Sequence, residues 1–417
     1  MRRLIDAPLH IIDGCRSCGS TKLTKILDLG ETPLADRLLT QETMDIPEPK
    51  APLDLVFCEN CSLVQILATV SPEVLFCDDY PYYSSVSPSL MKHFGDSARA
   101  IMESQALTED SLVIEAASND GYMLHHFRDS GISVLGIDPA EGPANKAIER
   151  GVPTLKTFFS EDLAQSLKAQ GREADVFLAN NVLAHVADLN GFVAGIKALL
   201  KDNGLAVIEA PYLLDLIEKL EFDTIYHQHL CYFSVTALVV LFEHHGLSLN
   251  HVEKTAIHGG SLRLFIQPTA DRRSSVDTFL ENEKALGVDT AAYYKAFGER
   301  VEGLKNALMT ILDSLRDENK SIAGYGAAAK ANTLMSYCGI NGQHLEFIAD
   351  KNPFKQGRFM SGNALPICDP VKIATDAPDY LLILAWNFAD EIIDQQANFR
   401  QQGGKFIIPV PEPHIVS

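Results

Sequence analysis

Short apolar runs alternate with amphipathic helical segments along most of this chain, and this pattern predicts two α/β units. In the first unit, over about 108–268, the runs predict buried strands at 112–117, 134–138, 175–181 and 204–210. The second unit starts near residue 319, where the predicted strands are 321–325, 347–350, 380–387 and 405–409. Alternation of this kind predicts open parallel sheets, which bind ligands at the carboxyl ends of their strands.

The segments outside these units have different patterns. Residues 270–318 combine charge with leucines at helical spacing, so they predict one or two helices that bridge the units. The first 70 residues form a small module, too short to be stabilised by burial alone. Within it, residues 27–37 are expected to be a loop with packed leucines.

Composition places the chain among globular proteins and narrows its partners. It has 417 residues, 46% of them hydrophobic and 8% aromatic, and a formal net charge of −20. Such an acidic chain is a poor general binder of nucleic acid, so no nucleic-acid partner is expected. No apolar run approaches the ~20 residues that cross a membrane, and residues 1–8 are not followed by an apolar segment. We therefore expect a cytoplasmic protein with no membrane contact.

Two C-x-x-C pairs in the first 70 residues predict a metal site. They are Cys15/Cys18, followed by a glycine, and Cys58/Cys61. Four thiolates from two such knuckles make a closed tetrahedral zinc site without an open position for water, which indicates a structural ion. The alternative is a redox C-x-x-C pair, which would not need the second knuckle.

A row of four proton-exchanging or hydrogen-bonding side chains, Tyr226-His227-Gln228-His229, is the densest chemical feature of the chain. This density suits proton abstraction beside a carbonyl. The other interpretation is a polar loop with two hydrogen-bonded histidines. A second cluster of phenols and hydroxyls, at 79–85, is broken by a proline and predicts a loop or short turn.

The first strands of the first unit carry the features of a nucleoside-binding site. Gly121 lets the backbone approach a ligand, and Asp138 can accept hydrogen bonds from both hydroxyls of a ribose. The turn lacks G-x-G-x-x-G, so a single-nucleoside cofactor such as S-adenosylmethionine fits better than a dinucleotide. His185 follows the third strand and is expected to face the same crevice. The residues assigned to the cofactor are Glu115, Asn119, Gly121, Asp138 and Asn180.

A second glycine turn, Gly324 to Lys330, begins the C-terminal unit and is a partial dinucleotide fingerprint. Three interpretations remain open: an NAD site, a site for the phosphates of another ligand at a helix N-terminus, and a scaffold turn without a ligand. In the second case Lys330 and Asn332 would lie near the anion.

Taken together, these segments resemble one family. The two knuckles, the 80–85 cluster, Asn119-Asp120-Gly121, the 226–229 block, His258-Gly259-Gly260 and the 324–330 turn are similar to those of sugar C-methyltransferases that act on nucleotide-linked 4-keto-6-deoxyhexoses. The resemblance covers nearly the whole chain. It implies an α/β protein with a zinc-binding module (1–70), a Rossmann-like class I methyltransferase domain (71–268), linking helices (269–318) and a Rossmann-like substrate-binding domain (319–417).

The resemblance also implies roles for individual residues. His229 would remove the proton next to the C4 keto group, Tyr226 and His185 would stabilise or protonate the C4 oxygen, and Tyr80 would line the site. The enolate carbon, expected to be C3', would then take the methyl group of S-adenosylmethionine while the zinc remains structural. The C-terminal domain would hold the nucleotide and not use NAD. The residues assigned to the substrate are Ser84, Ser85, His258, Lys330 and Asn332, and we expect a monomer.

Gln228 departs from the family pattern, which has a glutamate at this position. A glutamate could orient the histidine and raise its basicity, whereas an amide contributes no charge. An engineered variant, a natural enzyme in which His227 or another acid compensates, and a relative with a different substrate all remain open. The competing functions are O-methylation or C-methylation of another ketone, NAD-dependent oxidation, and a zinc-ribbon interaction module with degenerate enzyme domains.

Overall fold

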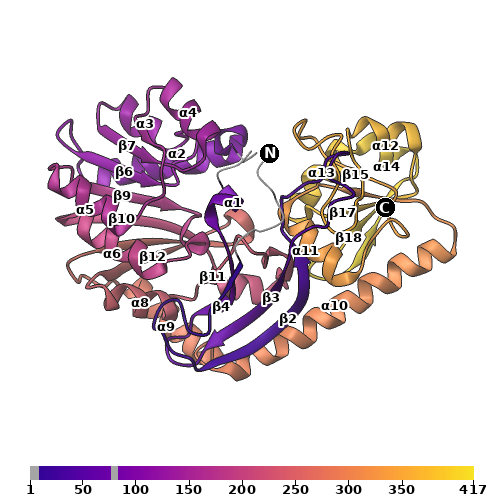
Figure 1. Ribbon diagram of the computed structural model, residues 1–417, viewed down its shortest axis with the longest axis horizontal. Coiled ribbons are helices and arrows are strands. Elements are labelled where there is room, and N and C mark those ends of the chain that lie inside the picture. Colours follow the sequence, from indigo (N-terminus) through magenta and orange to yellow (C-terminus); the bar gives the residue numbers. More distant parts are fainter. Residues whose placement is uncertain (1–8, 77–82) are drawn as a thin grey trace.

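The computed structural model describes residues 9–76 and 83–417 and contains two α/β units with an N-terminal β-structure between them (Figure 1). The N-terminal strands are β1 (Leu9–Ile11), β2 (Leu23–Pro33), β3 (Lys50–Cys58), β4 (Val64–Ile66) and β5 (Ala68–Val70). β1 pairs with β5, and the others form a sheet in the order β11-β4-β3-β2. β11 (Cys231–Tyr232) comes from the following unit, so the N-terminal sheet contains a strand that begins two residues after His229.

The prediction of a loop at 27–37 is wrong for residues 27–33, because β2 continues to Pro33. Leu27 and Leu29 are buried while Asp28 and Gly30 are exposed, which is the alternation of a half-buried strand. A register shift between Asp28 and Glu31 accommodates the glycine. The glycine and the following proline looked like loop residues in isolation, but pairing with β3 stabilises the extended backbone.

The central sheet has seven strands in the order β12-β13-β10-β9-β6-β7-β8. They are β6 (Leu112–Ala116), β7 (Ser133–Ile137), β8 (Thr154–Leu155), β9 (Ala174–Asn180), β10 (Leu200–Pro211), β12 (Ser248–Thr255) and β13 (Ser261–Gln267). All run in one direction except β13, which pairs antiparallel with both β10 and β12. The prediction of a fully parallel sheet is therefore wrong for β13. A hairpin through Gly259 and Gly260 reverses the chain before this strand.

Helices cover the faces of this sheet, and the turns at the ends of its parallel strands place the candidate site residues at one edge. They are α2 (Pro88–Ser104), α3 (Leu124–Asp129), α4 (Glu141–Glu149), α5 (Glu161–Ala169), α6 (Leu189–Leu199), α7 (Leu213–Glu218) and α8 (Val235–His244). One apolar core packs α2 and α3 against β6, β7 and β9, through side chains such as Phe94, Phe127 and Val176. Since the strands end in turns at the same edge, residues far apart in sequence meet there.

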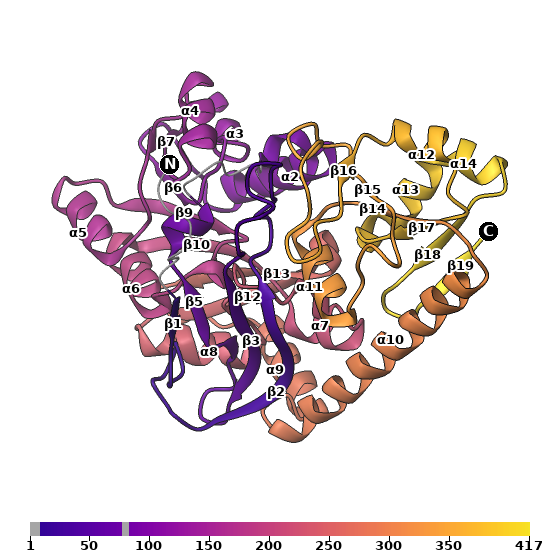
Figure 2. The same ribbon diagram turned by 45° about the vertical axis from the view of Figure 1, so that its right-hand side comes forward.

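Two helices and a second sheet complete the chain. α9 (Ser274–Leu286) and α10 (Ala291–Asp317) are the helices predicted over 270–318, and α10 contacts β2 and continues towards the C-terminal unit (Figure 2). The C-terminal sheet has the order β16-β15-β14-β17-β18-β19, with only β19 antiparallel. Its elements are β14 (Ile322–Tyr325), α11 (Ala329–Cys338), β15 (Ile348–Ala349), β16 (Ile367–Cys368), α12 (Val371–Asp376), β17 (Tyr380–Ile383), α13 (Ala389–Gln395), α14 (Ala397–Gln401), β18 (Lys405–Ile408) and β19 (His414–Val416).

The C-terminal unit also contacts the N-terminal strands. Asn332 on α11 donates its side-chain N–H to the carbonyl of Pro33 at 3.1 Å, and Leu39 and Phe359 form a β-bridge. Asn332 is only 2% exposed. The structure therefore gives Asn332, which was assigned to the substrate, a contact between two parts of the fold. Within the ranges described, no helix combines the length and the apolar character needed to span a bilayer.

Candidate active site

The turn between β6 and α3 is bent tightly enough for its backbone to approach a ligand. Ala117, Asn119 and Gly121 all have left-handed backbones, with φ of 53°, 48° and 76°. A side chain at Gly121 would be strained in this conformation and would lie 3.1 Å from Val152 Cγ2. The carboxylate of Asp138, just after β7, accepts N–H groups of Asn119 and Ala140, each at 2.8 Å. This fixes the acid beside the turn.

Several buried polar atoms around this turn have no hydrogen-bond partner among the described residues. They are Glu115 Oε2, Ser118 Oγ, Asp120 Oδ1 and Asn181 Oδ1. Burial raises the pKa of Asp138 to about 6. Buried polar atoms without a partner are costly unless a ligand completes them. The ammonium group of S-adenosylmethionine can donate to the Asp120 and Asn181 oxygens, and its ribose hydroxyls can both donate and accept, so the residues present fit this cofactor.

Glu115 and Asn180 meet beneath the turn, as expected for two residues of the cofactor set. Asn180 Nδ2 donates to Glu115 Oε1 at 3.1 Å and also contacts Met123 Sδ at 3.1 Å. Complete burial raises the pKa of Glu115 to about 8, so this carboxyl carries its proton at neutral pH.

We expect Glu115→Gln to remove a pH-dependent part of the stability. Because the pKa of Glu115 is raised from 4.5 to about 8 on folding, its proton stabilises the folded state most at low pH, and this contribution is lost as pH rises through 8. Between pH 6 and 8.5, the difference in unfolding free energy between wild type and variant should change by about 2–3 kcal/mol. Urea denaturation of the ligand-free proteins would measure it, and parallel pH profiles would contradict the assignment.

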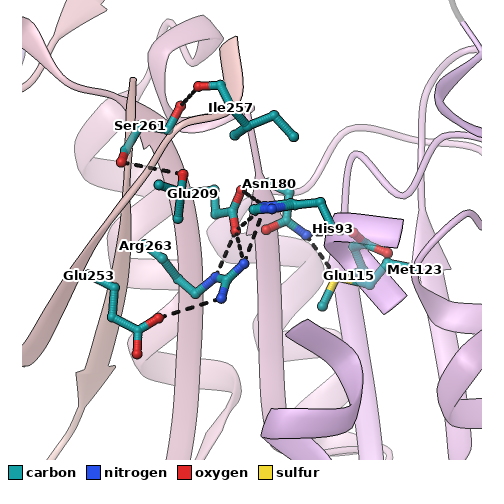
Figure 3. Close-up of polar contacts among 10 residues, drawn as sticks. His93, Glu115, Met123, Asn180, Glu209, Glu253, Ile257, Ser261 and Arg263 are labelled. Atoms are coloured by element: carbon teal, nitrogen blue, oxygen red, sulfur yellow. Dashed lines mark hydrogen bonds and ion pairs between the residues drawn. The ribbon is translucent and has the colours of Figure 1, made fainter. Parts of the chain in front are cut away.

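A charged network next to this pair was missed in the sequence (Figure 3). His93 on α2 lies 2.9 Å from both carboxylate oxygens of Glu209 on β10, and Arg263 Nε donates to Glu209 at 2.7 Å. Glu253 pairs with the outer side of Arg263. The network ties α2 to the sheet close to Asn180, which pairs with Glu209 in register. Glu209 stands in the apolar run at 204–210 and could have indicated the network, because a buried carboxylate needs charged or hydrogen-bonding partners.

Ser84 and Ser85 bind the cofactor turn itself. The Ser84 N–H donates to Asn119 Oδ1 at 2.9 Å, while the Ser85 hydroxyl donates to Asp120, which also pairs with Arg150 at 3.0 Å. Both serines thus hold the segment before α2 against the turn. Their predicted contact with substrate stays a prediction. Tyr80 lies outside the described residues, as does the side chain of His258.

The structure brings Tyr226, His229 and His185 together at the carboxyl edge of the sheet. Tyr226 Oη lies 3.1 Å from His229 Nε2, and the ring centroids of His185 and His229 are 4.8 Å apart. His229 Nδ1 lies 2.7 Å from the carbonyl of Thr224. A carbonyl only accepts, so Nδ1 carries the proton and Nε2 offers its lone pair to the Tyr226 phenol. This is the tautomer that a base requires.

His185 has a different environment. Its Nδ1 donates to the main-chain carbonyl of Gln228 at 2.6 Å, which leaves a lone pair on Nε2. Burial lowers the pKa of His185 to about 4, so the ring is neutral near pH 7. A neutral imidazole with this tautomer accepts a hydrogen bond at Nε2. The expectation that His185 protonates the C4 oxygen therefore does not suit its state in this structure.

Gln228 acts through its backbone. Its side chain is 7% exposed and makes no hydrogen bond to another described residue. The orientation that the family pattern assigns to a glutamate comes here from carbonyls, of Thr224 for His229 and of Gln228 for His185. His227 points elsewhere, because its Nε2 lies 3.3 Å from the carbonyl of Pro52 on β3.

The four cysteines of the knuckles converge. The sulfur atoms of Cys15, Cys18, Cys58 and Cys61 lie within 4.8 Å of one another, with 3.5 Å between Cys15 and Cys61 and 3.6 Å between Cys18 and Cys58. Zn–S bonds of about 2.3 Å in a tetrahedron separate the sulfurs by about 3.8 Å. The site therefore fits a structural zinc ion. Its four sulfur ligands would leave no coordination position for a water or a substrate.

The glycine turn of the C-terminal unit is occupied by the protein itself. A Cβ on Gly326 would lie 2.6 Å from the Cβ of Ala385. Asp350, the acid after β15, accepts the N–H groups of Ala327 at 2.7 Å and Asn352 at 2.8 Å. The close approach and the acid that a dinucleotide needs are thus used for packing and internal hydrogen bonds, which favours the scaffold interpretation of this turn.

Lys330 lies in a mixed charged environment. Its Nζ is 3.8 Å from the centroid of the Trp386 ring, and Trp386 Nε1 donates to Asp223 at 2.7 Å. Burial lowers the pKa of Lys330, while Asp223 and Glu221 favour its charged form. Two carboxylates therefore already face the predicted anion-binding lysine, and its contact with a nucleotide stays a prediction.

Comparison with known proteins identifies the family. Family models described as "Putative zinc binding domain", "Methyltransferase domain" and "C-methyltransferase C-terminal domain" match residues 15–76, 93–252 and 256–411. The C-methyltransferase NovU of Streptomyces niveus is 36% identical over 409 residues, which cover 97% of each chain. This chain belongs to the C-methyltransferase family. The predicted fold class, cofactor and zinc module of this C-methyltransferase are thereby confirmed, and S-adenosylmethionine is its methyl donor.

Other known proteins match only part of this C-methyltransferase. A ubiquinone biosynthesis O-methyltransferase of Azorhizobium caulinodans is 27% identical over 123 residues, 28% of this chain and 46% of that protein. The magnesium protoporphyrin IX methyltransferase of Synechocystis PCC 6803, solved with bound SAH, is 15% identical, with a TM-score of 0.33 over 42% of this chain and 81% of that one.

Proposed function

We propose that this C-methyltransferase methylates the carbon next to the keto group, C3', of a nucleotide-linked 4-keto-6-deoxyhexose. The observation that carries the proposal is the Tyr226–His229 pair, in which the Thr224 carbonyl holds His229 in the tautomer of a base. Carbon methylation requires a carbanion equivalent, and a proton next to a ketone is acidic enough for an imidazole to remove it.

In the proposed reaction His229 Nε2 takes the proton from the carbon, and the electrons of the C–H bond move into the ketone to form an enolate. The Tyr226 O–H donates to Nε2 in the structure. When this O–H turns to the C4 oxygen, it releases the lone pair of the base and stabilises the enolate at the same time. The Thr224 carbonyl then stabilises the imidazolium through Nδ1–H.

The other residues orient the reactants. We propose that neutral His185 accepts a hydrogen bond from a sugar hydroxyl at Nε2, since it has no proton there to give. Glu115, Asn119, Gly121, Asp138 and Asn180 hold the cofactor at the turn. When bound, S-adenosylmethionine supplies an electrophilic methyl group and leaves as S-adenosylhomocysteine. Ser84, Ser85, Lys330 and Asn332 remain candidates for support of the substrate side.

The test separates cofactor, substrate and mechanism. Calorimetric titrations should show binding of S-adenosylmethionine and S-adenosylhomocysteine and none of NAD. In D₂O without a methyl donor, a panel of nucleoside-diphosphate-linked 4-keto-6-deoxyhexoses should include one that exchanges its C3' proton. The same compound should gain a C3' methyl group when the donor is added. Methylation of an oxygen, or the absence of exchange and methylation throughout the panel, would overturn the proposal.

A further inference from the structure

The first zinc knuckle is bonded to the loop that carries His185. Arg16, between Cys15 and Cys18, extends its guanidinium group to the carbonyl of Ala187 at 3.4 Å, two residues after His185. The same group donates to the Ile66 carbonyl at 3.2 Å and to Thr69 Oγ1 at 2.7 Å. One side chain therefore joins β4, β5 and the loop after β9.

The segment that follows this loop also donates hydrogen bonds back to the first knuckle. Asn190, at the start of α6, donates its side-chain N–H to the carbonyls of Arg16 and Ser17, each at 3.0 Å. These are the two residues between the cysteines of the first knuckle. The knuckle backbone, whose shape depends on the metal, thus accepts hydrogen bonds from the element that follows His185.

The second zinc knuckle supports the segment that carries His229. β4 begins three residues after Cys61 and pairs with β11, two residues after His229. The Ile66 N–H donates to the carbonyl of Leu230 at 3.0 Å. The ring of His227 reaches the carbonyl of Pro52 on β3 at 3.3 Å. β3, which ends at the zinc site, and β4, which starts after it, therefore support the 226–230 segment.

The two loops are in turn bonded to each other. The Leu230 N–H donates to the Ala184 carbonyl at 2.7 Å, and His185 Nδ1 donates to the Gln228 carbonyl at 2.6 Å. The knuckles, the loop after β9 and the 226–230 segment make a closed ring of hydrogen bonds, most of them from a side chain to a main-chain carbonyl. A base must lie within hydrogen-bond reach of its proton, and misplacement of about 1 Å can cost about 100-fold in rate.

We propose that the zinc module sets the relative position of His185 and His229, and that Arg16 is the positioning residue that connects the two. This inference rests on the proposed function only in treating these two imidazoles as active-site groups. It extends the role of the zinc beyond folding: the ion fixes the knuckle, the knuckle fixes Arg16, and Arg16 fixes the loop of His185. Arg16 itself contacts no reacting atom.

The test compares Arg16→Met, which keeps the length but removes the donors, with Arg16→Lys, which restores one of them. We expect Arg16→Met to keep about one zinc per chain and to bind S-adenosylmethionine within about twofold of wild type. Its kcat should fall at least about tenfold at a temperature well below its Tm, with partial recovery in Arg16→Lys. Arg272→Met is the matched control, since Arg272 pairs with Glu243 on the surface.

A second readout does not depend on turnover. With ¹⁵N-labelled histidine, the ring signals of His185, assigned by their loss in His185→Gln, should shift in Arg16→Met and not in the control. Asn190→Ala removes the hydrogen bonds to the carbonyls of Arg16 and Ser17 and should also lower kcat and shift the ring signals. This variant provides the test if Arg16→Met fails to fold. Unchanged kcat and ring signals in folded, zinc-loaded variants would overturn the inference. If wild type were inactive on the keto-sugar panel while the His185 ring signals still shifted in Arg16→Met, only the proposed function would be overturned.

Discussion

His229→Asn should reduce kcat at least about 1,000-fold, because it removes the group that takes the proton from the substrate carbon. Asparagine can keep a side-chain N–H directed at the Thr224 carbonyl, as His229 Nδ1 is now, but it has no basic nitrogen in place of Nε2. The local fold should therefore survive. The measurement is single-turnover methyl transfer together with C3' proton exchange in D₂O, and both should be lost.

Binding of S-adenosylmethionine should be unchanged in this variant, since His229 lies outside the turn that holds the cofactor. His244→Asn is the matched control: His244 is an exposed residue at the end of α8, and its loss should leave kcat within about twofold. If His229→Asn retained full activity, His229 would not be the base. His185, whose Nε2 also carries a lone pair, would then be the next candidate.

Cys58→Ser should release the zinc and lower the free energy of unfolding by an amount on the order of 5 kcal/mol. Cys58 is 0% exposed, and its sulfur lies in the closed four-sulfur cluster. A serine hydroxyl does not ionise at neutral pH, so the fourth ligand is lost. The side chains of the N-terminal strands are buried in a core that they share with the neighbouring units, so the loosening should start at the two knuckles around the empty site.

Metal analysis and thermal denaturation would measure this effect, with Cys368→Ser in β16 as the matched control outside the cluster. The control should keep its zinc and most of its stability. Activity should also fall in Cys58→Ser, because the 183–188 and 226–230 segments are bonded to the knuckles. An unaltered Tm and metal content would contradict the structural role of the zinc.

Several features of this enzyme were predictable because they depend on residues close in sequence. The C-x-x-C spacing predicts a zinc knuckle from local geometry, and the alternation of apolar runs with helical segments predicts the two α/β units. Glu115 and Asp138 could be proposed as cofactor residues because each stands at or just after the end of a buried strand. The strand β2 was missed because its leucines alternate around a glycine and a proline that looked like loop residues.

Other features depend on contacts that no local pattern contains. Asn332 and Ser85 were assigned to the substrate, and this assignment stays a prediction, but their contacts with Pro33 and Asp120 could not be read from the sequence. Arg16 and Asn190 carry no local signal in the sequence, and their partners are 171 to 174 positions away. Hydrogen bonds between distant segments are fixed only when the sheets pack, so a single sequence carries no signal for these pairs.

The sequence by itself determined the four cysteines of the zinc module and the class of fold, and it proposed the residues of the candidate active site, because short-range spacing and periodicity are sufficient for these. The tertiary structure alone decided how they work together. It decided that the basic lone pair of His229 is on Nε2, directed at the Tyr226 phenol, with Nδ1 held by Thr224, and that burial keeps His185 neutral. It also decided that the zinc knuckles support both histidines. Tautomer, pKa and position depend on burial and on partners from other segments, and only packing brings these together.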